Sequence, residues 1–387
     1  MKRIKRNIKY CLYKILNKHD FIQNINYNSN EQKKVLIVYV TSPFNKSLVD
    51  GLTHTNIQES LQIVKYFIDN NYCIDVIDCM EKEYKKLIKK NYYNCVIGLG
   101  DAFKYACEVN RNSKHIMYLT ESSPRFSYKQ EMERVKYYNQ RYRKRINIAR
   151  SNMFYKDSHF KDINNLILIG NEHTKSTYDY LGKNIFTIDA TGLKNKNFKS
   201  ERNINESKLN FLWFGSYGAI HKGLDILVEI FNNNPNINLF IAGLRKEEEK
   251  YIKLGAKNIY NIGFVNVNSE KFNELMNKCS FVILASCSEG MATSVLTCMN
   301  HGLIPLVTKE CGISLEEQFL LHDYRIDKVE EKIKLWTEKS NEEILNLHKY
   351  IELYSLDKYG IEKFYENFSE IMNQIIGDKN EDFTHIH

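Results

Sequence analysis

Short apolar segments alternate with helical segments along most of the chain, and this alternation constrains the fold more than any other feature. From residue 33 onward, runs of four to six residues rich in Val, Ile and Leu recur, as is typical of buried parallel strands. Between them lie stripes at helical spacing, such as Ile57, Leu61, Val64, Phe67 and Ile68. This order predicts parallel sheets with helices on both faces.

The expected strands fall into two sets, and 387 residues are enough for two domains. The first set is expected at residues 35–40, 73–77, 95–99, 116–119, 166–169 and 185–188. The second set is expected at residues 211–214, 239–242, 259–264, 281–284 and 304–307. Helices of the second set are expected near residues 224–231, 269–277, 294–301 and 316–321, before a helical tail. We predict two Rossmann-like parallel-sheet domains that face each other across a cleft.

The domain boundaries follow from changes in this pattern. Residues 189–207 lose apolar periodicity and gain Lys, Asn and Ser, which is typical of a linker. We expect a basic amphipathic segment at 1–32, a first domain at 33–190, a linker at 191–207, a second domain at 208–350, helices at 351–376 and a tail at 377–387.

The first 18 residues are rich in Lys and Arg and contain no acid. Their apolar residues recur at helical spacing, so one face is apolar and the other basic. The segment lacks the long apolar run of a secretory signal or a membrane span. Such a helix either lies on an anionic membrane surface or is solvated or docked on the protein. We expect a cytoplasmic protein, with peripheral membrane contact through residues 1–18 as one interpretation.

A highly charged helical stretch at residues 128–150 interrupts the first set of strands. It contains eight basic side chains: Lys129, Arg134, Lys136, Arg141, Arg143, Lys144, Arg145 and Arg150. Most charge runs are solvated faces, and we expect this of the helix. The alternative is a surface that meets a phosphate-bearing acceptor or lipid headgroups.

Composition excludes several classes of protein. The net charge of +8 is a mild excess that does not indicate nucleic acid as a partner. The nine cysteines form no C-x-x-C pair and several lie in apolar runs, so buried thiols are expected rather than a disulfide framework. No residue pattern has the spacing of a metal site, and we expect neither a metal nor a bound cofactor.

The first segment that could bind a ligand or take part in catalysis is FLWFGSYGAIHKGLD, residues 211–225. A strand ends at Gly215, a loop follows with Gly218, and a helix begins near Lys222 and Gly223. Glycines let a backbone approach an anion closely, and a helix N-terminus offers free N–H groups. Lysine adds a point charge suited to a diphosphate. The loop matches neither a Walker A motif nor G-x-G-x-x-G, so an ordinary turn is the alternative.

The second segment, residues 281–308, reads strand, small-residue loop, helix, Gly302 and strand. Its loop carries Glu289 at the carboxyl edge of the sheet, where ligands bind in open α/β folds. Small residues at Gly290, Ala292 and Thr293 leave room for a ligand beside backbone N–H groups.

These two segments resemble the carboxyl-terminal half of family 4 glycosyltransferases, which are retaining enzymes of the GT-B architecture. The resemblance covers residues 208–327, and its positions match in order and spacing: Phe214, Gly215, Lys222, Gly223, Glu289, Gly290, Met299, Gly302 and Pro305. The first half agrees in its alternation only. In this architecture the last helix crosses back to the first domain; the alternative is that it caps its own domain.

Two positions depart from the family pattern. Thr297 replaces the second glutamate, which usually holds the ribose hydroxyls, and threonine offers no bidentate carboxylate. Ser216 replaces an arginine that often follows the strand glycine. His221 or a residue of the first domain could supply the charge that Ser216 lacks.

The resemblance implies roles for the matched residues. Lys222 would neutralise the leaving nucleoside diphosphate in place of a metal, and Glu289 would contact the donor sugar. The further donor-binding candidates are Gly215, Ser216, Gly218, His221, Gly223, Gly290, Met291, Ala292, Thr293 and Thr297. Retention would follow from front-face attack without a protein nucleophile, so no glycosidase-type carboxylate pair is expected.

The first domain should supply the acceptor site. Polar loops follow two of its strands, at residues 41–56 and 120–125. Within them, His54, Thr55 and Glu121 are candidates for contacts with an acceptor hydroxyl, although each residue type is more often a helix cap or a surface group.

The resemblance favours transfer of a sugar from a nucleotide sugar to a glycan, a lipid-linked or a similar acceptor, in synthesis of a surface polysaccharide. A nucleotide-sugar-binding relative without catalysis, acting as a partner or scaffold, is the main alternative because of Thr297 and Ser216. A dinucleotide oxidoreductase or sugar epimerase is a third, and the absence of G-x-G-x-x-G near the first strand argues against the oxidoreductase.

Overall fold

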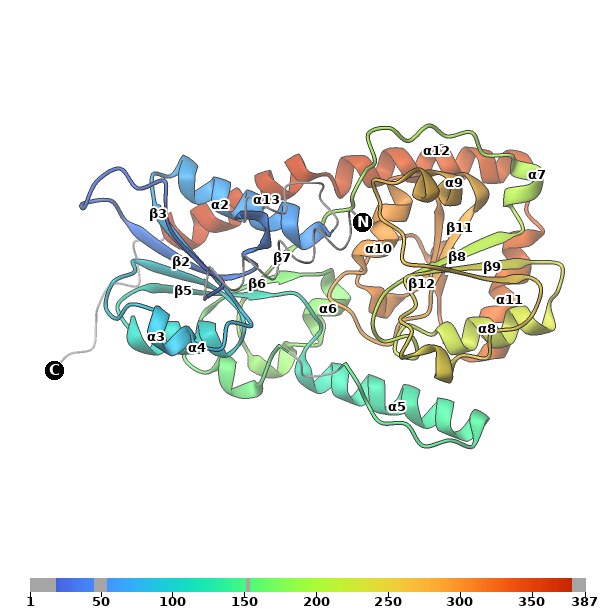
Figure 1. Ribbon diagram of the computed structural model, residues 1–387, viewed down its shortest axis with the longest axis horizontal. Coiled ribbons are helices and arrows are strands. Elements are labelled where there is room, and N and C mark those ends of the chain that lie inside the picture. The colour runs from blue at the N-terminus through green and yellow to red at the C-terminus, as the bar shows by residue number, and fades with distance from the viewer. Residues whose placement is uncertain (1–18, 45–53, 151–153, 378–387) are drawn as a thin grey trace, which may run out of the picture.

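The computed structural model describes residues 19–44, 54–150 and 154–377, and these form two α/β lobes side by side (Figure 1). The expected basic helix within residues 1–18 lies outside the described residues, as does the tail beyond Gly377. Within the described chain, no helix is long and apolar enough to cross a membrane.

The first lobe contains a seven-stranded sheet in the order β1-β3-β2-β4-β5-β6-β7. Its strands are β1 (Phe21–Ile25), β2 (Lys34–Tyr39), β3 (Cys73–Asp78), β4 (Cys95–Gly98), β5 (Lys114–Leu119), β6 (Asn165–Ile169) and β7 (Ile185–Ile188). All neighbours pair in parallel except β1, which is antiparallel to β3 at the edge. The parallel part is the doubly wound sheet that the alternation predicts.

The helices of the first lobe lie between these strands. They are α2 (Thr55–Asp69), α3 (Tyr84–Leu87), α4 (Gly100–Val109), α5 (Pro124–Tyr142) and α6 (Glu172–Ser176), with short 3-10 turns at Ser42–Phe44, Asp157–Phe160 and Asp179–Leu181.

The second lobe contains a parallel six-stranded sheet in the order β10-β9-β8-β11-β12-β13. Its strands are β8 (Asn210–Phe214), β9 (Asn238–Ala242), β10 (Ile259–Gly263), β11 (Phe281–Leu284), β12 (Ile304–Thr308) and β13 (Leu320–Leu321). Its helices are α7 (Ile204–Ser207), α8 (Leu224–Asn233), α9 (Glu270–Lys278), α10 (Thr293–Met299), α11 (Ile326–Thr337) and α12 (Asn341–Lys358), and 3-10 turns occupy Glu249–Tyr251, Lys309–Cys311 and Glu317–Phe319.

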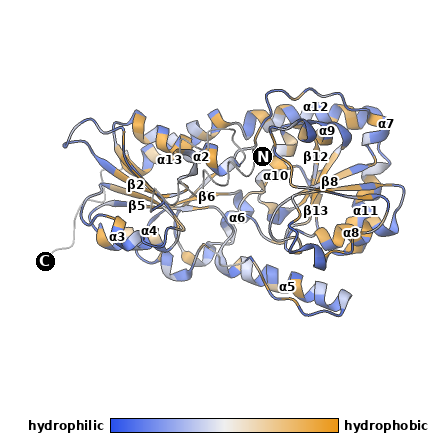
Figure 2. Ribbon diagram, viewed as in Figure 1, coloured by the Kyte–Doolittle hydropathy of each residue, from blue (hydrophilic) through white to orange (hydrophobic). Residues whose placement is uncertain are grey.

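The sheet cores are strongly apolar, as Figure 2 shows along the strands in the middle of each lobe. Strands β4, β11 and β12 are buried at every position, because helices cover both of their faces. All eight cysteines of the described residues are free thiols, most of them buried.

One local prediction was wrong, and two further regions contain elements that the sequence did not predict. Residues 316–321 form a 3-10 turn and strand β13 instead of a helix, because Leu320 pairs with Val307 of β12. Residues 21–25, within the expected basic segment, form edge strand β1. Residues 204–207, within the expected linker, form α7.

The last helix, α13 (Ile361–Gly377), leaves the second lobe and packs on α2 of the first (Figure 1). The Tyr66 hydroxyl donates to Asn373 at 2.9 Å, and the Tyr66 ring meets Phe368 edge-on. The last helix therefore crosses back from the second lobe to the first and links the two lobes.

Helix α5 reaches from the first lobe along α8 of the second (Figure 1). We expected the charged face of residues 128–150 to be solvated, and this expectation was wrong for Arg134 and Arg141. Arg134 is buried and donates to the Ala285 carbonyl at 2.8 Å, and Arg141 pairs with Asp225 and Glu229. Lys129, Lys136, Arg143, Lys144 and Arg145 are exposed. We call residues 124–150 the α5 arm.

Candidate functional site

A cavity of about 1000 Å³ lies between the lobes, where the carboxyl ends of both parallel sheets meet. From the first lobe, its polar lining includes His54, Thr55, Glu59, Thr120, Glu121 and Arg150. From the second lobe, the lining includes Gly215, Ser216, Lys222, Glu289, Met291, Ala292, Thr293 and Thr297. The lining thus brings together the acceptor-side candidates and most of the donor-side candidates.

Glycine is required where β8 meets this cavity. A Cβ on Gly215 would lie 2.5 Å from the Trp213 ring, and a Cβ on Gly243 would lie 2.0 Å from the Gly215 carbonyl oxygen. Two strand ends can pass this closely only without side chains. Because Gly215 lines the cavity and has no side chain, its backbone atoms face the cavity directly.

Two amides of the loop after Gly215 are bound by a side chain of the protein. The N–H groups of Gly218 and Ala219 donate to the Glu248 carboxylate at 3.0 and 2.9 Å. Glu248 is buried. The anion-binding capacity expected of the Gly218 backbone is therefore occupied by a carboxylate of the protein itself.

Lys222 and Glu289 form a buried ion pair on the cavity wall. Gly223 makes this possible, since its φ of +73° places it in the left-handed region and a Cβ there would lie 2.6 Å from the Ala285 carbonyl oxygen. The Ser286 hydroxyl also donates to Glu289 at 2.8 Å.

A third charged group joins this pair from the other lobe. The Arg150 Nη2 atom lies 2.9 Å from Glu289 Oε2, and its Nη1 atom lies 3.4 Å from Oε1. Burial raises the pKa of Glu289, but Arg150, Lys222 and His221 outweigh burial and hold this pKa far below its usual range. Burial and Arg150 together lower the pKa of Lys222.

His221 lies behind the cavity wall rather than on it. Its Nε2 atom is 2.5 Å from the Ser288 carbonyl oxygen, and its Nδ1 atom is 3.8 Å from a Glu131 oxygen. Burial lowers the pKa of His221, but Cys287 and Glu131 outweigh this effect and the pKa rises to about 9. Gly218, Gly223 and Gly290 also lie outside the cavity lining.

The loop before α10 forms one of the contacts between the lobes. The Ser122 hydroxyl donates to the Glu289 carbonyl at 2.5 Å, and the Thr174 hydroxyl donates to the Gly290 carbonyl at 3.0 Å. A Cβ on Gly290 would lie 2.2 Å from the Thr120 carbonyl oxygen, so the lobes touch where this glycine stands.

Thr297 lines the cavity, but its hydroxyl is engaged within the protein. It donates to the Thr293 carbonyl at 2.9 Å and accepts from the Leu193 N–H at 3.1 Å. The residue at the position of the family's ribose-binding glutamate therefore anchors the linker between the lobes.

The acceptor-side candidates line the first-lobe wall. Burial lowers the pKa of His54. Burial also raises the pKa of Glu121, with Arg150 opposing it. His54 is the N-cap residue of α2, but its side chain makes no capping hydrogen bond and is therefore not engaged by the helix end.

Sequence reasoning missed Glu59 and gave Arg150 no individual role. The Glu59 carboxylate accepts hydrogen bonds from the N–H and hydroxyl of Thr191 at 2.9 and 3.1 Å. Burial raises the pKa of Glu59 to about 7. Its place in the helical segment that contains Ile57 and Leu61 was visible in the sequence, but nothing local distinguishes a glutamate whose side chain is buried.

No group of three or more His, Cys, Asp or Glu side chains in residues 19–44, 54–150 and 154–377 is arranged to hold a metal ion. The cations that line the cavity are Arg150, Lys222, Arg245 and Lys246, and the carboxylates include Glu59, Asp78, Glu121, Glu247 and Glu289. An extended ligand with an anionic part and a polyhydroxyl part suits such a lining.

The comparisons with known proteins agree with this arrangement. Residues 195–353 match the family model described as glycosyl transferases group 1. A search of curated proteins finds no match.

Solved structures share the fold of nearly the whole chain. The sucrose-phosphate synthase of Thermosynechococcus elongatus has a TM-score of 0.63 at 11% identity, over 90% of this chain and 100% of that one. Alr3699/HepE of Anabaena, solved with UDP and glucose, has a TM-score of 0.59 at 12% identity, over 89% and 100%. A glycosyltransferase of Rickettsia africae has a TM-score of 0.58 at 12% identity, over 90% and 100%. The chain therefore has the GT-B fold, and its residues 195–353 are similar to the group 1 glycosyl transferases.

Proposed function

We propose that the protein transfers a sugar from a nucleotide-sugar donor, bound mainly by the second lobe, to an acceptor hydroxyl presented by the first lobe. The observation that carries this proposal is the buried pair of Lys222 and Glu289 on the wall of the interlobe cavity. The solved relative from Anabaena was crystallised with UDP-glucose, which supports a donor of that class.

The proposed reaction needs no covalent intermediate on the protein. The bond between the anomeric carbon and the diphosphate oxygen breaks, and a bond between that carbon and the acceptor oxygen forms on the same face. The acceptor proton passes to the departing diphosphate. Lys222 would stabilise the negative charge that develops on the leaving group, a role that needs no metal ion.

Glu289 would orient the donor sugar through its hydroxyls. Its carboxylate stays ionised because three cationic groups surround it, so it acts as an acceptor of hydrogen bonds rather than as a proton donor. The acceptor would be a glycan, a lipid-linked saccharide or a similar molecule of surface polysaccharide synthesis, near His54, Thr55 and Glu121.

The test is transfer or slow hydrolysis of one nucleotide sugar from a panel, with and without EDTA. Lys222→Met and Glu289→Gln should each lower turnover at least about 100-fold, because each removes charge or orientation from the reacting centre. The exposed Lys309→Met serves as the matched control on the same lobe. NMR of the first product formed distinguishes retention from inversion.

Thr297 favours one competing function. Because its hydroxyl already serves the linker, ribose must be held by other groups, and a non-catalytic nucleotide-sugar-binding protein is the second candidate. Saturable binding of a nucleotide sugar, without turnover against water or a broad acceptor panel, would support this candidate. Binding of NAD instead would contradict both.

A further inference from the structure

Two cations from opposite lobes share a single carboxylate at the cavity wall. Lys222 of the second lobe and Arg150 of the first both pair with Glu289. The exposed fraction of these side chains is 8% for Lys222, 21% for Arg150 and 6% for Glu289. One carboxylate balances only one of the two cations, so these three side chains together carry a formal charge of +1. Glu121 in the same lining also interacts with Arg150, and burial raises the pKa of Glu121.

The backbone of Arg150 is fixed in place by both lobes. Its N–H and that of Ala149 each donate to the buried Glu131 carboxylate of the α5 arm at 3.0 Å. The Tyr217 hydroxyl of the second lobe donates to the Ala149 carbonyl at 3.1 Å. Arg150 therefore reaches the cavity from a defined position rather than from a solvated loop.

The side chain of Arg150 lies over the loop that follows β8. A Cβ on Gly218 would lie 3.4 Å from Arg150 Cδ, so the guanidinium stem packs against this glycine. The same loop begins at Gly215 and Ser216, which line the cavity. Among the described residues of the first lobe, Arg150 is the only Lys or Arg in the lining.

We propose that Arg150 is a ligand of the donor's diphosphate, supplied by the first lobe to a site whose other cation, Lys222, belongs to the second. This inference rests on the proposed function. A guanidinium has five N–H donors in a planar fork, more than the two oxygens of Glu289 accept, so it can bridge this carboxylate and a phosphate. It supplies the charge that Ser216 does not.

The consequence is a leaving-group site that is complete only when the lobes are together. The α5 arm holds Arg150 against the second lobe, so binding of the diphosphate would strengthen the contact between them. The α5 arm then couples donor binding to the relative position of the lobes. The strength of this coupling is set by the difference in donor affinity between the protein with its lobes together and the protein with its lobes apart.

The experiment compares affinities for a nucleoside diphosphate and for its nucleoside. UDP, GDP and ADP are titrated into the wild type by calorimetry, and the tightest binder and its nucleoside are then measured against Arg150→Ala and Arg150→Lys. Arg150→Ala should weaken the diphosphate roughly 10- to 100-fold, the worth of one charged hydrogen-bonded contact. Affinity for the nucleoside, followed by ligand-observed NMR, should change less than about twofold. Arg150→Lys should fall between, because lysine keeps the charge but loses the fork.

Arg125→Ala is the matched control, since Arg125 belongs to the same arm but pairs with Asp157 at an exposed site. Thermal unfolding without ligand checks that the variants are folded. Equal weakening of diphosphate and nucleoside would show that Arg150 only positions the lobes and would overturn the inference. An unchanged diphosphate affinity would also overturn it and leave the proposed function standing. Failure of the wild type to bind any of the diphosphates would contradict both.

Discussion

Two carboxylates in the interlobe cavity lie in opposite electrostatic environments. Glu289 is surrounded by cationic groups, which hold its pKa far below the usual range. Glu59 is also buried, but the N–H and hydroxyl of Thr191 are its only hydrogen-bond partners among the described residues, and burial raises its pKa to about 7. One carboxylate is therefore charged at any physiological pH, while the other titrates near neutrality.

Glu59→Gln should reduce the loss of stability at high pH. A carboxyl that keeps its proton up to about pH 7 when folded, but loses it near 4.5 when unfolded, destabilises the fold as pH rises between these values. Gln stays neutral and keeps an oxygen for Thr191. Urea unfolding at pH 5 and pH 8 should show the variant gaining up to about 3 kcal/mol on the wild type across this range. A pH-independent difference would contradict the assigned environment, and the exposed Glu31→Gln is the control.

At the scale of the element, the α5 arm holds the lobes together through arginine. Arg141 pairs with Asp225, whose side chain is fully buried, and with Glu229 at 2.7 Å. Burial raises the pKa of Asp225, and Arg141 and Arg134 oppose this rise. The Arg141 guanidinium also lies 4.4 Å from the centroid of the Tyr137 ring and 5.1 Å from that of the Tyr142 ring.

Arg141→Ala should therefore destabilise the protein by roughly 3 kcal/mol, because it leaves a buried carboxylate without its partner. Arg125→Ala removes an exposed arginine–aspartate pair from the same arm and should cost at most about 1 kcal/mol. Chemical unfolding of the two variants at pH 7 measures this contrast. A loss for Arg141→Ala as small as that for Arg125→Ala would mean that the α5 arm contributes little to the contact between the lobes.

The elements also differ in how well sequence predicts them. Residues 281–308 were predictable because strand, loop and helix signals are all local, and β11, α10 and β12 form there. The role of α5 was not predictable, since the partners of Arg134 and Arg141 lie 151 and 84 residues away. Edge strand β1 was missed because its FIQNI sequence is short and half polar, and Asn24 there has a φ of +60°.

The site divides in the same way. Lys222 and Glu289 could be singled out from the sequence because each is followed directly by a glycine, within a short segment whose spacing matches the family pattern. The hydrogen bond from Leu193 to Thr297, and the contact of Arg150 with Glu289, depend on how the lobes meet. Contacts of this kind join residues that are far apart in the sequence, so the apolar periodicity of a single segment does not predict them.

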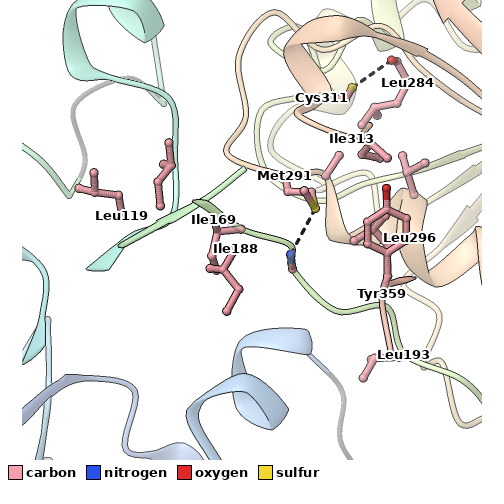
Figure 3. Close-up of a cluster of buried hydrophobic side chains, with 14 of the residues drawn as sticks. Leu119, Ile169, Ile188, Leu193, Leu284, Met291, Leu296, Cys311, Ile313 and Tyr359 are labelled. Carbon is pink, nitrogen blue, oxygen red and sulfur yellow. Dashed lines mark hydrogen bonds between the residues drawn. The ribbon is translucent and has the colours of Figure 1, made fainter. Parts of the chain in front are cut away.

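At the scale of the whole molecule, an apolar seam joins the two sheet cores. Figure 3 shows Ile169 and Ile188 of the first lobe in one cluster of buried apolar side chains with Met291, whose sulfur accepts from the Ala190 N–H at 3.3 Å. The linker adds polar anchors, since Thr191 binds Glu59 on one side and Leu193 binds Thr297 on the other. The lobes therefore share one continuous set of contacts rather than a bare hinge.

Gly290 offers a direct test of this shared interface. Its φ is not in the left-handed region, so alanine suits its backbone, but the added Cβ would lie 2.2 Å from the Thr120 carbonyl oxygen and 3.0 Å from the Glu121 nitrogen. Backbone atoms of a strand end cannot rotate away as a flexible side chain does. The relief available is movement of one lobe from the other.

Gly290→Ala should therefore lower the free energy of unfolding by roughly 1–3 kcal/mol, the usual cost of overpacking, and increase the radius of gyration measured by small-angle scattering. Gly377→Ala is the control, because a Cβ there meets no atom within 4 Å. If Gly290→Ala keeps the stability and dimensions of the wild type, the lobes do not meet at this glycine. If it loses stability but keeps its dimensions, the strain is absorbed within the loop, and the coupling of Arg150 to the position of the lobes loses its structural basis.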